Sequence, residues 1–590
     1  MRLRSHRRNI IHLEGEQSAA LQLAYGRLIL LGGLFALAYL LIAARTIDLM
    51  IVQGRHFEST QDSEELSRLA RSQDLLDHVR RGNIYDRNGV LLATSLKTPS
   101  LYADPELLLD KPKVSKALTE IFPDLKEQET LAKISIPKSR YAWLRPNISP
   151  QQQEKILDLG EPGLAFEYAD SRIYPQGKMA AHLIGYTGRD GRGLSGIERS
   201  AQKTLEQGQD ISLTLDVRLQ HALRREIETA ITEFSAQAGV GVILDAQTGE
   251  MLAGVSLPDY DLNANSLYVS DEEKYKEILR NRVTMGVYEF GSVFKIFTTA
   301  ALLETQDAPL ATTFDARKPL KIDGHTINDY HAQKRIMTVP EVFMHSSNIG
   351  SAMMAQAVGM DKLKAFLSDL GLMDKPSFDI REVSKPLLPP EPWAGSSLVT
   401  VSYGHGISVS ALQLCVATAT IINGGLQIHP KLILKSGADN IKPQARILSA
   451  ETSEKMRGLL RLVVTKGTGG KADVPGYYVG GKTGTAEKSG GKKGYNRKSL
   501  LSSFIGAFPI DNPRYVVFVM IDEPQGTKKS YGYATGGWVA APVVARVVTS
   551  MAAILGLPSD NYVEAQDISL PLQQYIKPEH PEKKLASNEQ

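Results

Sequence analysis

The sequence changes from short mixed elements to a clear strand pattern at Val240-Gly241-Val242-Ile243-Leu244-Asp245-Ala246-Gln247-Thr248-Gly249-Glu250-Met251-Leu252-Ala253-Gly254-Val255. Two apolar runs in this stretch flank a turn between Asp245 and Glu250. Short apolar runs that are bounded by turn residues are typical of buried β-strands. We therefore expect a strand, a turn and a second strand here.

The elements that follow predict how this hairpin is completed. Helical patterns run from about Ser292 to Gly371 and from Ala411 to Ile422, and a last apolar helix covers Ala541 to Leu555. Strand patterns return at Tyr477-Tyr478-Val479 and from Tyr515 to Ile521. Strands at both ends of a helical middle predict an α/β (α+β) fold, in which one sheet is closed by the two ends of the domain and has helices packed on it.

The composition is that of an ordinary globular protein. The chain has 590 residues, of which 42% are hydrophobic and 23% charged, and its formal net charge is only +3. Charge this close to balance gives no bulk electrostatic reason to expect nucleic acid as a partner. The single cysteine, Cys415, excludes an internal disulfide framework, and its position in an apolar run predicts a buried structural thiol.

One local segment departs from this average. Leu28 to Ala44 contains no charged residue and is bounded by Arg27 and Arg45. As a helix it would be about 26 Å long, near the lower limit for crossing a bilayer core. We interpret residues 28–45 as one uncleaved transmembrane anchor, because a signal-peptide core is normally shorter and a buried helix this apolar is unusual at a chain terminus.

Basic residues set the predicted orientation of this anchor. The first 27 residues contain Arg2, Arg4, Arg7 and Arg8, whereas the side that follows the span carries mixed charges. The positive-inside rule then keeps residues 1–27 as a cytoplasmic stub and places everything after the anchor outside the inner membrane. We expect a periplasmic N-terminal pedestal at 46–235, a second domain at 236–563 and a flexible tail rich in Pro, Lys and Glu at 564–590.

Lys482 belongs to two motifs that predict different chemistry. Gly476 to Thr483 fits the phosphate-loop template of nucleotide-binding proteins, and Val516 to Glu523 resembles an apolar strand that ends in Mg²⁺-binding acids. A phosphate loop needs an apolar strand before it and a helix that starts at the lysine, and neither flank of this segment fits. The alternative is Lys482-Thr483-Gly484 as the last of three motifs in the order S-x-x-K, S-x-N and K-T-G.

Four copies of S-x-x-K compete for the first motif, beginning at Ser135, Ser200, Ser292 and Ser489. A serine and a lysine three residues apart share a face only on a helix. Pro137 disfavours the first copy, glycines disfavour the last, and the Ser200 copy lies on a polar helix. Ser292 opens an apolar helical run, so we select Ser292 with Lys295.

The second motif has two candidates. Ser559-Asp560-Asn561 follows K-T-G in the chain and comes just after Pro558. Ser346-Ser347-Asn348 lies in the expected order and between two helical patterns, Val339 to Met344 and Ile349 to Val358. We therefore select Ser346 and Asn348.

These residue types in this order predict acyl transfer through a serine ester. Ser292 near a helix N-terminus is the expected nucleophile. Burial and the second cation at Lys482 should lower the pKa of Lys295, which makes a neutral amine available as the base. Ser346 would relay a proton to the leaving amine, and the Asn348 amide would hold a substrate peptide group.

The third motif is expected to bind substrate. Thr483, Gly484 and Thr485 should lie on an edge strand, with the threonine hydroxyls facing a substrate carboxylate. Backbone N–H groups of Ser292 and Thr485 would form the oxyanion hole. No metal and no cofactor is expected.

With these motifs the chain resembles the class B penicillin-binding proteins over nearly all of its length. The resemblance is carried by RGNIYDRNG at 81–89, SRIYP at 171–175, GLSGIE at 193–198, YEFGSVFK at 288–295, SSN at 346–348 and GKTGTAEK at 481–488. The stretches Ile521 to Pro524 and Gly537 to Pro542 are similar to the septal, FtsI-type branch. Two departures lie near the site: Phe290 stands where the family usually has Pro, and Gly404 to Ser410 lacks the usual Thr-Pro ending.

The resemblance implies the penicillin-binding transpeptidase fold and a peptidoglycan D,D-transpeptidase that cross-links stem peptides ending in D-Ala-D-Ala during septal cell-wall synthesis. It further implies β-lactams as inhibitors, and a membrane glycan polymerase and other division proteins as partners. An elongation-type transpeptidase, a D,D-carboxypeptidase or a β-lactamase would share the three motifs, and a non-enzymatic division scaffold or a nucleotide binder is a remote alternative.

Overall fold

The computed structural model describes residues 27, 33–43, 80–188, 190–264, 273–434, 444–489, 495–559 and 567–577. The chain divides into two compact units, Met1–Val79 and Arg80–Gln590. No helix in the described part of the chain is long and apolar enough to cross a membrane. Of the predicted anchor, residues 33–43 are helical, and residues 28–32, 44 and 45 lie outside the described residues, as do all residues of the predicted stub at 1–27 except Arg27.

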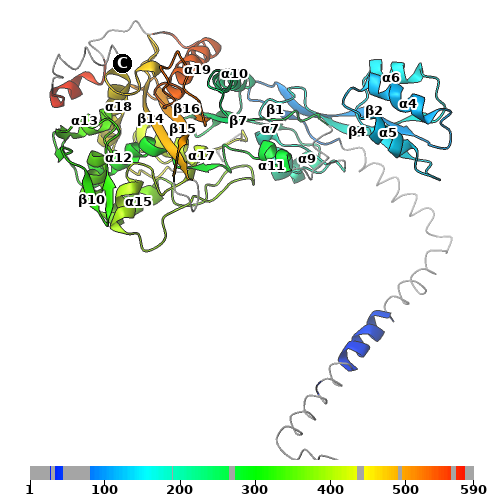
Figure 1. Cartoon of the computed structure of the whole chain (residues 1–590), viewed down its shortest axis with the longest axis horizontal. Coiled ribbons are helices and arrows are strands. Elements are labelled where there is room, and N and C mark those ends of the chain that lie inside the picture. The colour runs from blue at the N-terminus through cyan, green and yellow to red at the C-terminus, as the bar shows by residue number, and fades with distance from the viewer. Residues whose placement is uncertain are drawn as a thin grey trace, which may run out of the picture. The chain divides into compact units, whose positions relative to one another are not determined.

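One five-stranded antiparallel sheet organises the region from residue 238 to residue 577 (Figure 1). Its strand order is β14 (Gly480–Ser489), β15 (Tyr495–Phe508), β16 (Tyr515–Asp522), β6 (Ala238–Asp245) and β7 (Met251–Leu257). The central pair joins distant parts of the chain, because Val242 of β6 lies opposite Phe518 of β16. The predicted sheet, closed by the two ends of the domain, is confirmed.

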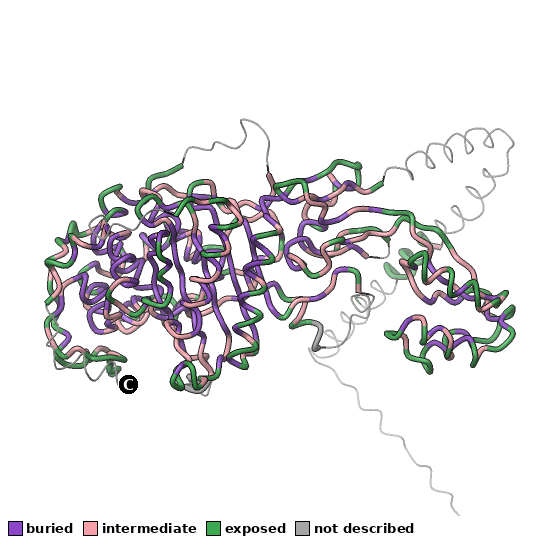
Figure 2. The backbone as a smooth tube through the Cα atoms, turned by 90° about the horizontal axis from the view of Figure 1, so that it is seen from above, coloured by how far each residue is buried: buried purple, intermediate pink, exposed green. Residues whose placement is uncertain are grey.

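Helices cover both faces of this sheet, so every residue of β6 and β7 is buried. On one face α10 (Val217–Glu233) and α19 (Ala540–Leu555) pack against side chains such as Ile243 and Val517. On the other face α12 (Lys295–Thr305), α17 (Ala411–Ile422) and α18 (Ala450–Thr465) pack against their neighbours along the strands, such as Val242 and Phe518. Figure 2 shows the buried backbone concentrated in these layers. Alternate residues of each strand therefore belong to two separate cores.

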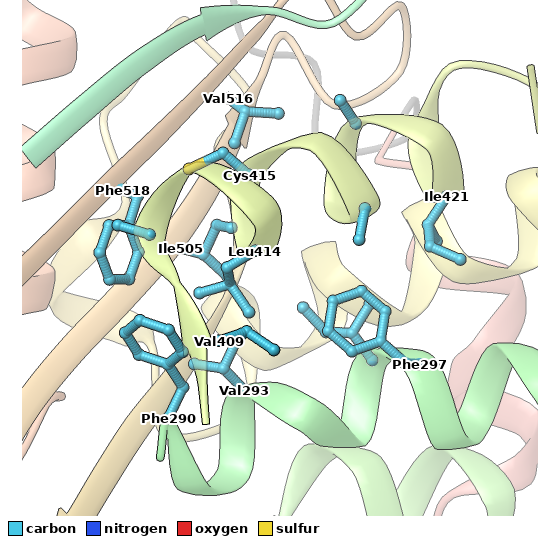
Figure 3. Packing of buried hydrophobic residues seen from close by; sticks show 14 of the residues in the cluster. Phe290, Val293, Phe297, Val409, Leu414, Cys415, Ile421, Ile505, Val516 and Phe518 are labelled. Atoms are coloured by element: carbon cyan, nitrogen blue, oxygen red, sulfur yellow. The ribbon is translucent and has the colours of Figure 1, made fainter. Parts of the chain in front are cut away.

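Cys415 is fully buried, as predicted, in the core between the sheet and helices α12, α17 and α18. It lies on α17 beside Val516 of β16 (Figure 3). Burial raises the pKa of its thiol well above the ordinary value, which keeps the thiol protonated.

The helical middle is interrupted more than the sequence suggests. Between α12 and the next long helix the chain forms two small antiparallel pairs, β10 with β11 and β9 with β12. These strands run over Thr313–Asp315, Leu320–Ile322, His325–Ile327 and Ile336–Thr338. Helices resume at α13 (Val339–Met344), α14 (Asn348–Val358) and α15 (Met360–Asp369). Each strand has only three residues, too few to show a period in the sequence. Smaller elements of this region are α11 (Glu273–Leu279), β8 (Val287–Tyr288), α16 (Gly395–Val401), β13 (Val409–Ser410) and η6 (Gly470–Ala472).

The predicted strand at Tyr477-Tyr478-Val479 is wrong. β14 begins only at Gly480, and the preceding backbone turns, with φ of 85° at Gly476 and 40° at Tyr478. Aromatic and β-branched residues gave these positions a strand-like pattern, but a positive φ is incompatible with an extended chain. The longest strand of the sheet, β15, was missed.

Residues 80–216 form the rest of the second unit. Its sheet runs β3-β2-β1-β5, with β4 also paired to β2. The strands are β1 (Ile84–Tyr85), β2 (Leu91–Ala103), β3 (Ala142–Arg145), β4 (Leu164–Ile173) and β5 (Ile211–Ser212), and the helices are α4 (Lys111–Ile121), α5 (Glu127–Ile134), α6 (Pro150–Leu157), α7 (Ala181–Ile184), α8 (Gly196–Ser200) and α9 (Gln202–Glu206). Three motif residues meet here, because Glu198, fully buried, binds Arg81 and Arg172 at 2.7 Å each.

Two segments, helix α10 and residues 567–577, pack on the domain at 236–563 although the expected limits place them outside it. Helix α10 lies within the predicted pedestal range, yet it packs on β6 and β7 through residues such as Leu223 and Ile227. Residues 567–577, assigned to a flexible tail, include η9 (Leu570–Tyr575) and pack on the domain. Asp567 holds this segment by a 2.9 Å ion pair to Arg461 of α18, whose side chain is 2% exposed. The polar composition of the tail gave no sign of this buried ion pair.

Candidate active site

Ser292 lies on a single 3₁₀ turn, η4 (Gly291–Phe294), which leads directly into α12. The turn is held against strand β14, because a Cβ at Gly291 would come within 2.7 Å of the Thr485 carbonyl oxygen. Gly291 also has a φ of 53°, which glycine adopts without strain. Ser292 is therefore placed between the start of an apolar helix and the K-T-G strand.

Lys295, one turn further on, points its amine into a cluster of oxygen atoms. Its Nζ lies 3.0 Å from Ser292 Oγ, 3.1 Å from Ser346 Oγ and 2.8 Å from Asn348 Oδ1, and it also contacts the Ser346 carbonyl oxygen. Carbonyl oxygens only accept hydrogen bonds. A neutral amine has two N–H groups for the two carbonyl oxygens, and its lone pair is then left for a serine hydroxyl. The contacts therefore suit a neutral lysine.

The surroundings of Lys295 favour that neutral form. The side chain is completely buried, and desolvation, together with the nearby cation Lys482, lowers the pKa of Lys295 well below its ordinary value, while Asp329 acts in the opposite direction. Burial also lowers the pKa of Lys482, to about 7. Two buried lysines that share one hydroxyl between them cannot both hold a proton at low cost.

That shared hydroxyl belongs to Ser346, in the short connection between α13 and α14. Ser346 has a φ of 59°, an uncommon conformation for a residue with a side chain. Its Oγ receives a 2.9 Å hydrogen bond from Lys482 Nζ and lies 3.1 Å from Lys295 Nζ. The first two motifs and the third thus meet at one oxygen atom.

Asn348 is the first residue of α14, and both ends of its amide are engaged. Its Oδ1 faces Lys295, and its Nδ2 donates to the Asn328 carbonyl oxygen over 3.1 Å. Ser347 caps the helix by accepting from the Gly350 N–H over 2.9 Å. The Asn348 amide is therefore bound within the protein rather than presented as an unpaired group.

Strand β14 carries the third motif along one edge of the sheet. Thr483, 6% exposed, shares a 2.7 Å hydrogen bond with Thr468, and Thr485 Oγ1 accepts from the Gly536 N–H over 3.0 Å. A hydroxyl that accepts one hydrogen bond still has its own proton to donate. Gly484 permits close packing, because a Cβ there would lie 2.6 Å from the Phe290 carbonyl oxygen.

The competing motif copies lie elsewhere. Ser135 follows α5 on the surface, Ser200 ends α8, Ser489 ends β14, and Ser559 is exposed after α19. Lys482 lies inside a strand rather than at a helix start, so the phosphate-loop geometry is absent at this lysine. Among the described residues, no group of three or more His, Cys, Asp or Glu side chains could hold a metal ion.

Three contributors were missed by sequence reasoning. Asp329 accepts from Ser347 Oγ at 2.8 Å and from the Ile349 N–H at 2.9 Å. Thr468 and Gly536 contact the two threonines of β14. All three come from irregular segments without a recognisable spacing to the motifs, so no sequence signal was available for them.

The comparisons with known proteins agree with this geometry. The model of the penicillin-binding protein transpeptidase domain matches residues 239–549, and that of the penicillin-binding protein dimerisation domain matches residues 77–214. The chain belongs to the penicillin-binding protein transpeptidase family. This penicillin-binding protein has both domains of class B, so the predicted resemblance is confirmed.

Curated relatives and solved structures cover most of this penicillin-binding protein. A probable peptidoglycan D,D-transpeptidase FtsI from Caulobacter vibrioides is 40% identical over 491 residues, which are 81% of this chain and 82% of that protein. The peptidoglycan D,D-transpeptidase FtsI of Escherichia coli K12 is 29% identical and covers 81% of this chain and 84% of its own length. Penicillin-binding protein 3 from Mycobacterium tuberculosis, complexed with aztreonam, is 26% identical with a TM-score of 0.64, over 82% of this chain and 97% of that one.

Both departures from the family pattern pack beside η4, the turn that carries Ser292 in this penicillin-binding protein. Phe290 is 1% exposed, and its ring meets that of Phe518 edge-on at 5.3 Å (Figure 3). Gly404 accepts a 3.3 Å hydrogen bond from the Gly291 N–H through its carbonyl oxygen. An aromatic contact to the sheet therefore supports the turn at the position where the family usually has proline.

Proposed function

We propose that this penicillin-binding protein is a peptidoglycan D,D-transpeptidase that cross-links stem peptides through a serine ester on Ser292. One observation carries the proposal. A completely buried lysine amine, Lys295 Nζ, lies within 3.1 Å of two serine hydroxyls and also contacts two carbonyl oxygens. This arrangement holds a base against a nucleophile before substrate binds.

Acylation follows from these contacts. Ser292 Oγ attacks the carbonyl carbon of the penultimate D-alanine while its proton passes to Lys295 Nζ. The carbonyl oxygen becomes an oxyanion, for which we propose the Ser292 and Thr485 N–H groups as donors. Collapse of this intermediate breaks the peptide bond and leaves an ester on Ser292. A β-lactam would react in the same way, with its ring opened.

The leaving group also needs a proton. Ser346 Oγ lies between the two lysines, so it can give its proton to the departing amine of D-alanine and regain one from Lys295. In the second half of the cycle an amine of a second stem peptide attacks the ester, and the same groups act in reverse. Ser292 Oγ then recovers its proton and a new peptide bond is formed.

Substrate would lie along β14. We propose that the Thr485 hydroxyl donates to the terminal carboxylate of the stem peptide, with Lys482, Thr483 and Gly484 forming the adjacent wall. Lys482 would supply positive charge toward that carboxylate through the Ser346 hydroxyl. For Asn348 we propose a role in orienting Lys295, because its Oδ1 already accepts from the amine.

We extend the proposal to the place of the protein in the cell. The uncharged run at 28–44 supports a single-pass anchor at 28–45 in the inner membrane, with a cytoplasmic stub at 1–27 and periplasmic domains at 46–235 and 236–563. The matched ranges 77–214 and 239–549 fall within these two segments. Because α10 packs on the sheet, the structural boundary is better drawn before residue 217. Within the tail at 564–590, residues 567–577 pack on the domain.

A septal role is supported by similarity to relatives named FtsI and by the sequence branch that residues 521–524 and 537–542 resemble. Division proteins and a membrane glycan polymerase would then be the protein partners. Depletion of the chain in cells is the test of this role. Filaments with normal width would support septal synthesis, and rounded or widened cells would instead indicate the elongation branch.

The chemical proposal is tested by intact mass after incubation of the full-length chain with a β-lactam. We expect a stable adduct of one β-lactam per chain that is absent in Ser292→Ala. Rapid loss of the adduct would indicate a β-lactamase, and no adduct would contradict the serine ester. Release of D-alanine from a stem peptide, with and without an acceptor amine, separates a transpeptidase from a carboxypeptidase.

A further inference from the structure

The S-x-N motif is held from outside by a carboxylate that belongs to none of the three motifs. Asp329 follows β11 in the β10–β11 hairpin, nineteen positions before Asn348 in the chain. Its two oxygen atoms take separate partners: Oδ2 accepts from Ser347 Oγ over 2.8 Å, and Oδ1 accepts from the Ile349 N–H over 2.9 Å. The carboxylate therefore binds on both sides of Asn348.

Each of these contacts gives an acceptor to a hydrogen-bond donor at the start of α14, namely the Ser347 hydroxyl and the Ile349 N–H. The Ser347 hydroxyl accepts from the Gly350 N–H, and its single proton is directed to Asp329. The Ile349 N–H is one of the first four N–H groups of α14, which have no partner within the helix. A carboxylate at this position also interacts favourably with the N-terminal end of the helix dipole.

The residue before Asp329 fixes the direction of the Asn348 amide. The Asn328 carbonyl oxygen accepts from Asn348 Nδ2 over 3.1 Å. A carbonyl cannot donate, so the amide nitrogen must face Asn328 and the amide oxygen must face Lys295. Rotation of the amide by half a turn would place two acceptors against each other. Two adjacent loop residues thus hold three consecutive residues of the helix start.

We infer that Asp329 is a positioning residue for acylation: it fixes the first turn of α14 so that Ser346 and Asn348 keep their contacts with the Lys295 amine. This inference rests on the proposed function. Ser346 directly precedes the residue that Asp329 binds, and it has the uncommon φ of 59°. A conformation of this kind persists where its surroundings hold it in place. Asp329 supplies part of that hold without touching substrate.

The test uses Asp329→Asn and Ser347→Ala in the full-length chain, with a fluorescent penicillin as the probe. Asparagine keeps the shape but loses the charge and one acceptor. Stopped-flow acylation separates the chemical rate constant from the non-covalent dissociation constant. We expect each variant to lower the rate constant about ten- to a hundredfold, as a small displacement of a reacting group does, with the dissociation constant unchanged.

The pH profile adds a readout that a merely structural role would not move. Asp329 raises the pKa of Lys295, whereas Lys482 and desolvation lower it. In Asp329→Asn the acid limb of the rate should therefore move to lower pH, and in Ser347→Ala, which keeps the carboxylate, it should stay in place. The double variant should lose less than the product of the two single losses, because both changes break the same contact.

Asp323→Asn is the matched control. Asp323 is the other carboxylate of this hairpin and accepts from the Ser396 N–H over 2.6 Å, away from α14. We expect its acylation rate to stay within about twofold of the unsubstituted chain. An equal loss in Asp323→Asn, an unchanged rate constant in Asp329→Asn, or independent effects of the two changes would each overturn the inference. Failure of the unsubstituted chain to form an adduct would instead contradict the proposed function. Thermal melting shows whether Asp329→Asn is folded. If it is not, the rate constant of Ser347→Ala is used for the test.

Discussion

The Ser346 hydroxyl accepts a 2.9 Å hydrogen bond from the Lys482 amine, although 136 positions separate the two residues in the chain. The same hydroxyl lies 3.1 Å from Lys295 Nζ. It thus links the lysine of the S-x-x-K motif with the lysine of the K-T-G motif. A hydroxyl between two amines can pass a proton in either direction, depending on which amine is neutral.

Replacement of this hydroxyl should slow the reaction strongly. We expect Ser346→Ala to reduce the rate of acylation by a β-lactam about 10²- to 10⁴-fold, the usual range for loss of a general acid or base. Ser559→Ala is the matched control, because Ser559 belongs to the second S-x-N copy and is exposed beyond α19. Stopped-flow fluorescence measures both variants. A silent Ser346→Ala with a slow Ser559→Ala would reverse the motif assignment.

The acylation rate should depend on pH through Lys295. The amine acts only when neutral, so the rate should fall as the pH drops below the pKa of Lys295, which lies well below its ordinary value. Lys482 lowers this pKa as a neighbouring cation. In Lys482→Met the acid limb should therefore shift to higher pH, in addition to any loss of maximal rate. An acid limb that does not move would show that Lys482 carries no charge near Lys295.

Lys482→Met should also stabilise the fold. The folded pKa of Lys482 is about 7, and an unfolded lysine has a pKa of about 10.4. Between these values the unfolded chain binds a proton that the folded chain does not, so the stability of the unsubstituted chain should rise with pH. We expect a gain of about 1–4 kcal/mol in the free energy of unfolding at pH 7 and a smaller gain near pH 10. Denaturant titration at the two pH values measures it.

The packing of η4 on β14 leaves no room for a side chain at Gly484. A Cβ there would lie 2.4 Å from Ser503 Oγ and 2.8 Å from Val293 Cγ2. We expect Gly484→Ala to lower the free energy of unfolding by about 1–3 kcal/mol and to slow acylation by displacing the nucleophile turn. Gly470→Ala, where the nearest atom would be 3.6 Å away, is the control and should change neither quantity. Equal losses of stability and of acylation rate in the two variants would argue against a steric clash at Gly484.

The C-terminal segment should contribute to stability rather than to chemistry. Truncation after residue 566 removes Asp567 and leaves the buried Arg461 without one of its two carboxylates, the other being Asp473. We expect a loss of about 3 kcal/mol in the free energy of unfolding. Truncation after Lys577 keeps the contact of the Lys577 N–H with Glu341 and serves as the control. Thermal melting of both truncated chains would reveal the difference, and equal melting temperatures would contradict it.

The part of the site that could be predicted from sequence is the part set by helix geometry. Ser292 and Lys295 are three positions apart on an apolar helical run, and Ser346 separates two helical patterns, so their local placement follows from short-range rules. The order of the motifs then favoured Lys482 as their third partner. Family resemblance supplied the reaction and the expectation that these motifs converge.

The part that could not be predicted depends on contacts between distant segments. Asp329 reaches Ser347 from the irregular segment after β11, and Thr468 reaches Thr483 from a loop, without any periodic pattern in either segment. The strand expected at residues 477–479 failed because Tyr478 adopts a positive φ, which residue preferences do not reveal. The buried ion pair of Asp567 with Arg461 is likewise not visible in the polar composition of residues 564–590.

The pairing of β6 with β16 has a consequence for how the molecule is made. Val242 and Phe518 lie side by side in the sheet, so the centre of the sheet cannot form until almost all of the chain has been synthesised and, if exported, translocated. Strand β14, with Lys482, also arrives late. Until then Lys295 lacks the neighbouring cation of Lys482, which together with desolvation lowers its pKa in the folded protein. A chain that ends before β14 should therefore hold Ser292 without a neutral lysine beside it.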